Sequence, residues 1–290
     1  MKALIIFNPC AGSNRYRAVN NIADKMRQMG HEIELCATQS AGHATSIVQK
    51  TQGSNDDFDA IIAAGGDGTI NEVINGFDTK KRQLLSIIPF GTANVLAHEL
   101  GATRENAPYV LQSGQLKNIY MGLMGTRRFT MMAGVGFDSW SVKNVDTKLK
   151  AKIGPLAYGV SLLKSLKTFK SHSYSVLIDG SNYEAKSVLI MKGQRYGGPF
   201  ILAKNISLNT PEFEVFLFQK NDLLSILRYG ISLAMGRMNK LKDVKAVTGK
   251  SIDIIGPDGT PVQVDGDHAG FLPINLTIEK NGINILVPEK

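Results

Sequence analysis

The pattern of apolar and polar residues divides the chain into two parts. Up to about residue 124, short apolar runs are each followed by a glycine-containing loop and a stretch with helical spacing. The run at 60–64 contains no polar position, which is typical of a strand buried on both faces of a parallel sheet. Strands that alternate with helices in this way predict a doubly wound α/β domain.

The elements of this first part can be bounded from the same pattern. We expect strands at 3–7, 32–37, 60–64 and 84–88. We expect helices that end near Gly30, start near Gly42, and cover 70–75 and 94–100.

Beyond about residue 125, short alternating segments and turn signals indicate an antiparallel β domain. We expect one hairpin of 175–178 with 183–191, and a second of 274–279 with 283–287. Further strands are expected at 251–255 and 262–264, and helices at 155–169 and 222–241. The predicted domains are therefore 1–124 and 125–290, with the last strand free to return to the first domain.

Composition narrows the class of protein. The chain has 290 residues, 43% hydrophobic and 20% charged, and a mean hydropathy of −0.06, as in ordinary globular proteins. We expect no transmembrane helix and no signal peptide, because the apolar runs are too short. Cys10 and Cys36 give no disulfide framework, which favours a reducing cytoplasm.

The net charge of +8 fits nucleic acid, an anionic membrane or a polyphosphate substrate as the binding partner. Without a basic-aromatic motif, we do not expect nucleic-acid binding.

The loop Gly65-Gly66-Asp67-Gly68-Thr69 is the strongest chemical signal. Glycines let backbone amides approach a phosphate, and the following helix, with Thr69 as its expected cap, adds about half a positive charge. The loop lacks the Gly-Lys-Ser/Thr of a Walker A motif. Asp67 would repel a phosphate unless Mg²⁺ or water bridges the two, which favours nucleotide chemistry. A glycine-rich strand–helix turn without a ligand remains the alternative.

The segment from Gly65 to Gly76 resembles the signature of the diacylglycerol kinase catalytic-domain family, which includes sphingosine and ceramide kinases and bacterial soluble lipid kinases. The likeness continues in family order at 8–12, 89–94, 134–138, 153–158 and 264–267, and with Val287-Pro288. The chain resembles nicotinamide-dinucleotide kinases and phosphofructokinases less, because 71–73 and 91–94 carry lipid-kinase features. The resemblance implies an N-terminal α/β nucleotide-binding domain and a C-terminal antiparallel β-sandwich domain.

The resemblance also implies residue roles. Asp67 would help to hold Mg²⁺, through the nucleotide or through water. The acceptor-side motif, usually Asp-Gly-Glu, reads Asp265-Gly266-Asp267 here, so both aspartates are candidates for the general base. A plain hairpin turn is the alternative for this motif. The residues expected to line the ATP site are Asn8, Pro9, Cys10, Ala11, Gly12, Thr38, Gly65, Gly66, Asp67, Gly68, Thr69, Ile70, Asn71, Gly91 and Thr92.

Two departures from the family pattern stand out. Many bacterial relatives have Asn-Asp after the Gly-Thr loop, whereas Val95 follows Asn94 here. Some relatives bind a structural Mg²⁺ through an Asp-Asp-Gly stretch in the second domain. The corresponding stretch here is Asn209-Thr210-Pro211, which offers no carboxylate, so we predict that this structural metal site is absent or degraded.

The resemblance predicts a cytoplasmic, Mg²⁺-dependent kinase that transfers the γ-phosphate of ATP to the hydroxyl of a diacylglycerol-like or sphingoid lipid. A kinase of a non-lipid acceptor, or a nucleotide-binding regulator without activity, remains the alternative. Such an enzyme would dock transiently on an anionic membrane, and a homodimer stays open. The candidate docking segment, 222–242, combines an apolar stripe with basic residues. For the apolar stripe, a helix packed on the core with a solvated basic edge is the alternative, and we prefer it to membrane docking. The stripe and the basic residues are Leu223, Leu227, Ile231, Ala234, Met238 and Leu241, with Arg228, Arg237, Lys240 and Lys242.

Overall fold

A computed structural model of the chain describes residues 1–9, 13–54, 58–143 and 172–289. The chain forms two compact units. The first comprises Met1–Tyr120 together with Lys280–Lys290, and the second comprises Met121–Glu279. The division thus falls a few residues before the expected 124/125 boundary, and the last strand belongs to the first unit. The expected helix at 155–169 and the motif at 153–158 lie outside the described residues.

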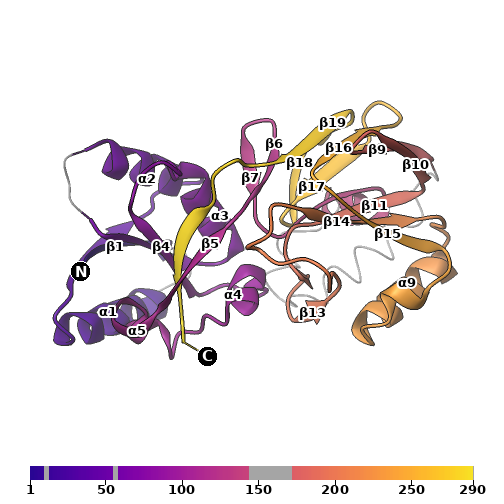
Figure 1. The fold of residues 1–290 in the computed structure, drawn as a ribbon. Coiled ribbons are helices and arrows are strands. Elements are labelled where there is room, and N and C mark those ends of the chain that lie inside the picture. Colours follow the sequence, from indigo (N-terminus) through magenta and orange to yellow (C-terminus); the bar gives the residue numbers. More distant parts are fainter. Residues whose placement is uncertain (10–12, 55–57, 144–171, 290) are drawn as a thin grey trace. The chain divides into compact units, whose positions relative to one another are not determined.

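The first unit is built on a six-stranded sheet of order β2-β1-β3-β4-β20-β5 (Figure 1). Neighbouring strands from β2 to β20 pair in parallel, and β5 closes the edge antiparallel to β20. The strands are β1 (Lys2–Phe7), β2 (Glu32–Ala37), β3 (Ala60–Gly65), β4 (Leu84–Pro89), β5 (Gln115–Ile119) and β20 (Ile283–Val287). This mostly parallel sheet confirms the predicted α/β class.

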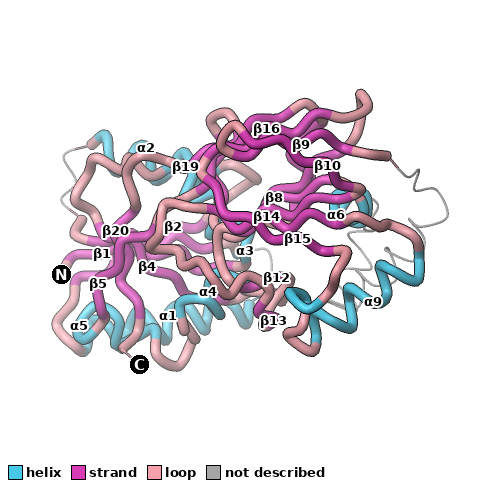
Figure 2. The backbone as a smooth tube through the Cα atoms, turned by 45° about the vertical axis from the view of Figure 1, so that its right-hand side comes forward, coloured by secondary structure: helices cyan, strands magenta, loops and turns pink. Residues whose placement is uncertain are grey.

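Helices cover both faces of this sheet, α2 and α3 on one side and α1 with α5 on the other (Figures 1 and 2). Ala3, Ile5 and Phe7 of β1 pack in one hydrophobic cluster with Val19 and Met26 of α1. The intervening β1 residues are also buried, as the uninterrupted apolar runs predicted. The helices are α1 (Ser13–Gln28), α2 (His43–Gly53), α3 (Asp67–Gly76), α4 (Val95–Leu100), α5 (Val110–Ser113) and the short η2 (Ala107–Tyr109).

The second unit consists mainly of two six-stranded sheets, of order β10-β9-β16-β19-β6-β7 and β15-β14-β11-β8-β17-β18. All strand pairs in them are antiparallel. The strands are β6 (Gly122–Met124), β7 (Arg127–Phe129), β8 (Met132–Val135), β9 (Tyr174–Ile178), β10 (Ser181–Ala185), β11 (Ser187–Met191), β14 (Phe213–Phe218), β15 (Val244–Gly249), β16 (Ser251–Ile255), β17 (Pro261–Val264), β18 (Asp267–Phe271) and β19 (Ile274–Ile278), with β12 (Arg195–Tyr196) and β13 (Phe200–Ile201) as a separate pair.

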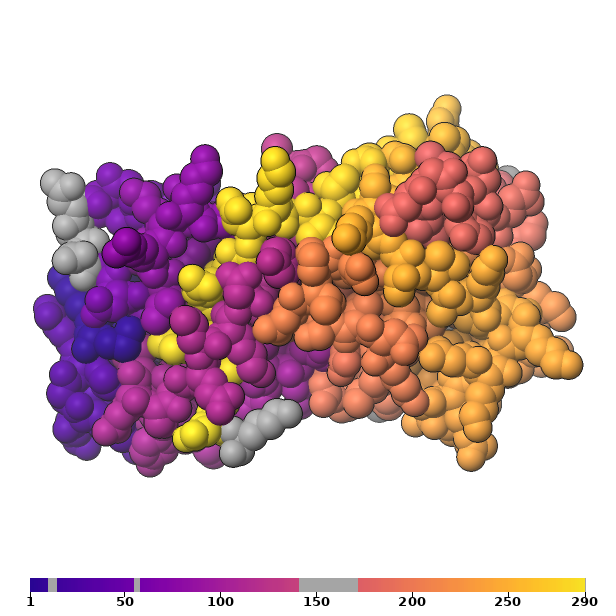
Figure 3. Space-filling model, viewed as in Figure 1, coloured from indigo at the N-terminus to yellow at the C-terminus, as the bar shows by residue number. Residues whose placement is uncertain are grey.

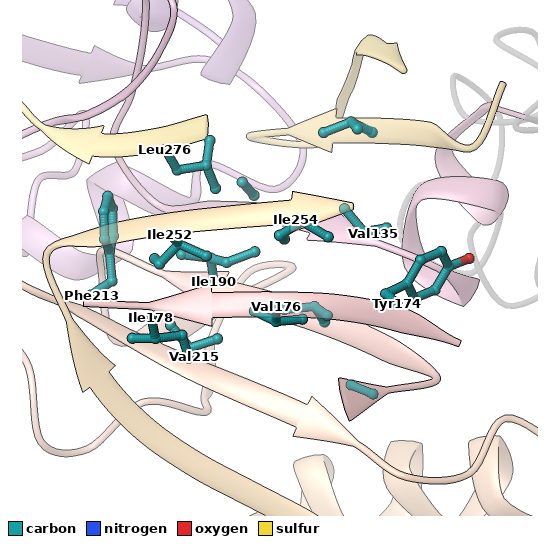
Figure 4. Close-up of a cluster of buried hydrophobic side chains, with 14 of the residues drawn as sticks. Val135, Tyr174, Val176, Ile178, Ile190, Phe213, Val215, Ile252, Ile254 and Leu276 are labelled. Atoms are coloured by element: carbon teal, nitrogen blue, oxygen red, sulfur yellow. The ribbon is translucent and has the colours of Figure 1, made fainter. Parts of the chain in front are cut away.

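One hydrophobic core joins the two sheets of this unit (Figure 4). Val176 and Ile252 of the first sheet and Ile190 and Val215 of the second belong to the same buried cluster. Side chains from two facing sheets make a β-sandwich, as predicted. Within the described residues of this unit, helical segments accompany the sandwich at α6 (Phe137–Lys143), α9 (Leu223–Ala234) and η3 (Met238–Lys240).

Three local predictions need correction. The second hairpin is wrong: β19 pairs with β16 and β6, whereas β20 pairs with β4 and β5 of the first unit. The first hairpin turns at Asp179-Gly180 as expected, but its second arm is two strands, because β10 and β11 lie in different sheets. The helix expected at 222–241 ends at Ala234, since Gly236 adopts a positive φ of 62°.

Candidate functional site

The residues expected at the nucleotide site follow the carboxyl ends of neighbouring parallel strands. Asn8 follows β1, Thr38 follows β2, Gly65 ends β3 and Gly91 lies after β4. Parallel strands place these ends at one edge of the sheet, where α/β sheets commonly bind ligands. Cys10, Ala11 and Gly12, also expected there, lie outside the described residues.

The glycine loop at 65–69 and the loop after β4, which contains Gly91, touch each other through their backbones. A Cβ atom on Gly91 would lie 2.6 Å from Cα of Gly66 and 2.7 Å from Oδ1 of Asn94. A Cβ on Gly65 would lie 2.5 Å from Cβ of Thr69. By contrast, a Cβ on Gly68 would meet no atom within 4 Å. Gly65, Gly66 and Gly91 therefore allow the loops to pack closely. The exposed Gly68 offers backbone that a ligand could approach.

The helix after the loop starts earlier than predicted. α3 begins at Asp67, and Gly66 is its N-cap, without a side-chain cap hydrogen bond. Thr69 therefore lies within the first turn and does not cap the helix, because its side chain packs against Gly65 instead. The N-terminus of α3, where backbone N–H groups and the helix dipole favour an anion, coincides with the glycine loop.

Asp67 has a protein partner that sequence reasoning did not anticipate. Its Oδ1 accepts a hydrogen bond of 2.7 Å from the backbone N–H of Val95, the first residue of α4. Asn94, at a φ of 45°, closes the preceding loop, since its Oδ1 accepts from the Gly91 N–H and its Nδ2 donates to the Gly91 carbonyl, both at 2.8 Å. Asp67 thus connects the glycine loop to the loop after β4.

Ile70 and Glu72, both in α3, serve packing. Ile70 is only 1% exposed and its N–H donates to the Gly66 carbonyl, so we no longer expect it to contact a ligand. Glu72 accepts a hydrogen bond of 3.3 Å from the Ala44 N–H in the first turn of α2, a favourable place for a carboxylate. A Cβ on Gly76 would lie 2.6 Å from the carbonyl oxygen of Thr45. The continuation of the motif therefore fixes α3 against α2.

Asn71 has a partner within α3. Its side chain is 8% exposed, and its Oδ1 accepts from Nδ2 of Asn75 at 2.7 Å. Thr92, in the loop after β4, is exposed to solvent.

Arg15 belongs to the same region and was missed by the sequence analysis. Its Nη2 donates to the carbonyl of Phe90 at 2.9 Å and its Nη1 to the carbonyl of Asn8 at 3.5 Å. It therefore links the segments after β1 and β4. A cation in the first turn of a helix opposes the helix dipole, and this was the signal that Arg15 has a partner elsewhere.

On the acceptor side, Asp265 is held by backbone amides. Together with Gly266 it forms the turn between β17 and β18, and both have a positive φ, of 49° and 82°. Its carboxylate accepts hydrogen bonds from the N–H groups of Thr130, Met131 and Met132, at 2.8, 2.9 and 3.0 Å. Asp265 therefore lies in a hairpin turn and both of its oxygens hold backbone, while its catalytic role stays a prediction.

Asp267 lies in a different environment. It begins β18, its side chain is 57% exposed, and one of its oxygens lies 3.7 Å from Nη2 of Arg127. A carboxylate in such a position can be reached by a substrate. The two aspartates of the motif therefore differ in accessibility, which the sequence could not distinguish.

A buried carboxylate, that of Asp138, is linked to the Asp265-Gly266 turn by hydrogen bonds. Asp138 accepts hydrogen bonds from the hydroxyl of Tyr196 and, at 2.7 Å, from Nε2 of Gln263. Oε1 of Gln263 in turn accepts from the Gly266 N–H at 2.9 Å. Burial raises the pKa of Asp138. Asp138, the last residue of the motif at 134–138, is thus connected through Gln263 to the Asp265-Gly266 turn.

The stretch expected to lack a structural metal is an exposed polar turn. Oγ1 of Thr210 donates to the Ser207 carbonyl at 2.8 Å, and the N–H of Asn209 donates to Oγ of Ser207 at 3.3 Å. Within the described ranges, no group of three or more His, Cys, Asp or Glu side chains is placed to hold a metal. The loss of this metal site stays a prediction.

Comparison with known proteins agrees with these motifs. Residues 2–124 match the diacylglycerol kinase catalytic domain, and residues 131–287 match the YegS C-terminal NAD kinase beta sandwich-like domain. The chain belongs to the diacylglycerol kinase catalytic-domain family. It is a kinase whose phosphoryl acceptor is a hydroxyl group.

Relatives in this family match along their whole length. A diacylglycerol kinase of Staphylococcus carnosus is 29% identical over 294 residues, covering 99% of this chain and 95% of that protein. A diacylglycerol kinase of Bacillus subtilis is 28% identical, covering 100% and 97%. The crystal structure of a diacylglycerol kinase from Bacillus anthracis superposes with a TM-score of 0.77 at 24% identity, covering 99% and 96%, and supports the fold. No helix in the described part of the chain has the length and apolar character needed to cross a bilayer.

Proposed function

We propose that this kinase transfers the γ-phosphoryl group of ATP to the hydroxyl of a diacylglycerol-like lipid, with Mg²⁺. The observation that carries the proposal is the pair of touching glycine loops at the carboxyl edge of the first sheet, beside the N-terminus of α3. Such a site suits a polyphosphate. The lipid acceptor is supported by the full-length similarity to proteins described as diacylglycerol kinases.

The ATP phosphates would contact the N-terminus of α3 near Gly68, with Asn8, Thr38 and Thr92 around them. Arg15 would hold the two neighbouring segments in place through its bonds to Asn8 and Phe90. Catalysis of phosphoryl transfer is mainly positioning and electrostatic stabilisation, and fixed backbone donors supply both.

The donor set fits Mg²⁺ that is bound largely by the substrate. Mg²⁺ usually takes one or two protein carboxylates, the substrate phosphates and water. Asp67 is the carboxylate at the glycine loop, and it would hold the ion directly or through water. When bound, the ion would neutralise charge that develops on the transferred phosphoryl group.

We assign the general base to Asp267 and a positioning role to Asp265. Asp267 is exposed, whereas three backbone N–H groups occupy the carboxylate of Asp265. A hydrogen-bonded carboxylate favours its charged form and is a weak proton acceptor. Asp267 would take the proton from the acceptor hydroxyl while Asp265 fixes the turn from which Asp267 projects.

The test is phosphorylation by the purified protein with radiolabelled ATP. The acceptors are a diacylglycerol, ceramide, sphingosine and NAD⁺, with products identified by mass spectrometry. A labelled diacylglycerol phosphate is expected. Labelled NAD⁺ alone would establish a non-lipid acceptor, and nucleotide binding without turnover would indicate a regulator.

A variant pair ties this activity to the glycine loop. Asp67→Ala should lose at least about 3 kcal/mol of transition-state stabilisation, roughly a hundredfold in rate. Asp24→Ala, at an exposed aspartate paired with Arg27, should keep full activity. Full activity of the Asp67 variant would refute its assigned role.

A further inference from the structure

Helix α9 of the second unit exposes apolar side chains where a surface helix normally exposes polar ones. Leu224 is 78% exposed and Ile231 61%, and three neighbours on the same side of the helix are about half exposed: Leu223, Leu227 and Met235. The sequence favoured a core-packed helix for its predicted stripe. This is wrong for Leu223, Leu227 and Ile231, which are exposed, whereas Met238 is buried. The helix lies at the surface of the unit (Figures 1 and 3).

The other side of α9 makes the contacts with the fold. Its buried residues are Ser225, Ile226, Tyr229 and Ser232. Tyr229 packs on Phe218 of β14, with ring centroids 4.9 Å apart, and its hydroxyl donates to Asp243 at 2.7 Å. Because these contacts fix the rotation of the helix, the apolar stripe is held outward.

The charge around the stripe is basic. Lys220 precedes the helix, and Arg237, Lys240 and Lys242 follow it, all exposed. Nζ of Lys204 reaches the carbonyl of Gly236 at the same end. Asp222 and Asp243 are the acids of this segment, and each already has hydrogen-bond partners, the second including Arg228. An apolar stripe between basic ends matches a bilayer whose surface is anionic.

We propose that α9 docks the protein on an anionic lipid surface, with the stripe formed by Leu223, Leu224, Leu227, Ile231 and Met235 inserted at the level of the headgroups. A bilayer suits this face because it accepts apolar side chains without shape complementarity, while its anionic headgroups attract the flanking cations. The proposal rests on the proposed function only in that a lipid acceptor must be reached in a bilayer.

The test is co-sedimentation of the full chain with vesicles that contain no acceptor. Phosphatidylcholine vesicles with about 30% phosphatidylglycerol should bind the protein, and pure phosphatidylcholine or high salt should reduce binding, because surface charge is screened. The variant Leu224→Ser/Ile231→Ser should bind at least about tenfold more weakly, since two large apolar side chains no longer insert. Ile255→Ser, at a residue 60% exposed on β16, is the matched control and should bind like the wild type.

Kinetics separate docking from catalysis. With a short-chain, water-soluble diacylglycerol, the double variant should keep the wild-type rate, and with diacylglycerol in anionic vesicles it should lose at least about tenfold. Undiminished vesicle binding by the double variant would overturn the docking proposal, whatever the enzyme phosphorylates. So would a dimer, seen by sedimentation velocity, that the double variant abolishes, because the stripe would then bind a second copy. Absence of activity on every lipid, with vesicle binding intact, would instead overturn the proposed function.

A second inference comes from a buried charge in the same unit. Lys192, directly after β11, is 0% exposed. Its ammonium group donates to the carbonyls of Ser207 and Leu208, at 3.1 and 3.2 Å. Nε2 of Gln194 donates to the preceding carbonyl, that of Ile206, at 2.8 Å. Three consecutive carbonyls therefore accept hydrogen bonds from fixed side chains.

These carbonyls immediately precede the stretch that lacks the carboxylates for a structural Mg²⁺. A buried ammonium is stable only where hydrogen bonds replace its hydration, and carbonyl oxygens are also ligands for divalent cations. The residues present do not fit a divalent ion, because Asn209 and Thr210 provide no negative charge and a cation already lies beside the loop. We infer that the ammonium of Lys192 replaces a structural metal ion as the cation that orders 206–210.

Thermal unfolding without nucleotide tests this replacement. The melting temperature of the wild type should be the same in EDTA and in millimolar MgCl₂. Lys192→Met should lower it by at least about 5 °C, because the carbonyls of Ser207 and Leu208 lose the hydrogen bonds of the buried ammonium and only that of Ser207 keeps a donor in Thr210. The matched control, Lys250→Met, changes a lysine whose side chain is 62% exposed and should have little effect.

A gain of metal dependence provides the converse test. In the variant Lys192→Asn/Asn209→Asp/Thr210→Asp the ammonium is removed and two carboxylates are added beside the same carbonyls. Its melting temperature should rise with Mg²⁺ and fall with EDTA. A wild type that is destabilised by EDTA, or a Lys192→Met variant as stable as the wild type, would overturn the inference.

Discussion

The two aspartates of the Asp265-Gly266-Asp267 turn should respond to alanine in opposite ways. Asp265→Ala removes the acceptor of three backbone N–H groups. At about 1 kcal/mol for each donor left without a partner, the folded state should lose about 3 kcal/mol. For a unit of this size that corresponds to a fall in melting temperature of roughly 6–12 °C.

Asp267→Ala should leave stability almost unchanged. Its exposed interaction with Arg127 at 3.7 Å contributes less than about 1 kcal/mol. If it accepts the proton of the acceptor hydroxyl, kcat should fall by roughly a hundredfold or more, with the KM for ATP unchanged.

The assay combines thermal unfolding, followed by circular dichroism, with steady-state kinetics on labelled ATP and diacylglycerol. Asp258→Ala, at an exposed turn of the same unit, is the control and should match the wild type in both. A melting temperature of Asp265→Ala equal to that of the wild type would contradict the structural role. An undiminished kcat in Asp267→Ala would remove that residue as the base and return the role to Asp265.

Two further predictions concern stability. Gly91→Ala should destabilise the first unit by about 1–3 kcal/mol, seen as a lower urea midpoint, because the new Cβ would lie 2.6 Å from Cα of Gly66. Gly68→Ala, where nothing lies within 4 Å and the residue is in helix α3, should not lower the urea midpoint. For Asp138, burial raises the pKa above the 3.8 of a free side chain, so its ionisation weakens the folded state as pH rises from about 4 towards the raised value. Asp138→Asn should therefore show a smaller loss of stability over that pH range in urea titrations, and an unchanged pH dependence would contradict this account.

Local sequence predicted most elements of the first unit and part of those of the second. Apolar runs predicted β1, β3 and β4, and the run in β3 contains no polar position because a strand covered on both faces favours apolar residues throughout. Gly30, with a φ of 86°, ends α1 where expected. The glycine loop was recognisable because its spacing is set by backbone geometry alone, which is a local property.

The tertiary structure decided which partners these elements have. Nothing local tells that β20 pairs with β4 rather than with β19, since an Asn-Gly turn is compatible with a hairpin and with a crossing between units. The same holds for α9, whose apolar stripe has the period of a core helix and is exposed only because Tyr229 anchors the opposite side.

The candidate site shows the same division. The sequence by itself determined which residue types gather at the glycine loop and at the acceptor-side turn, because motifs and periodicity are written along the chain. Only the tertiary structure decided what each does: Asp67 bonds to Val95, Asp265 to the backbone at 130–132, and Lys192 to 207–208. The physical reason is that a hydrogen bond joins residues that are near in space. The separation of two residues along the chain does not indicate whether they form such a bond.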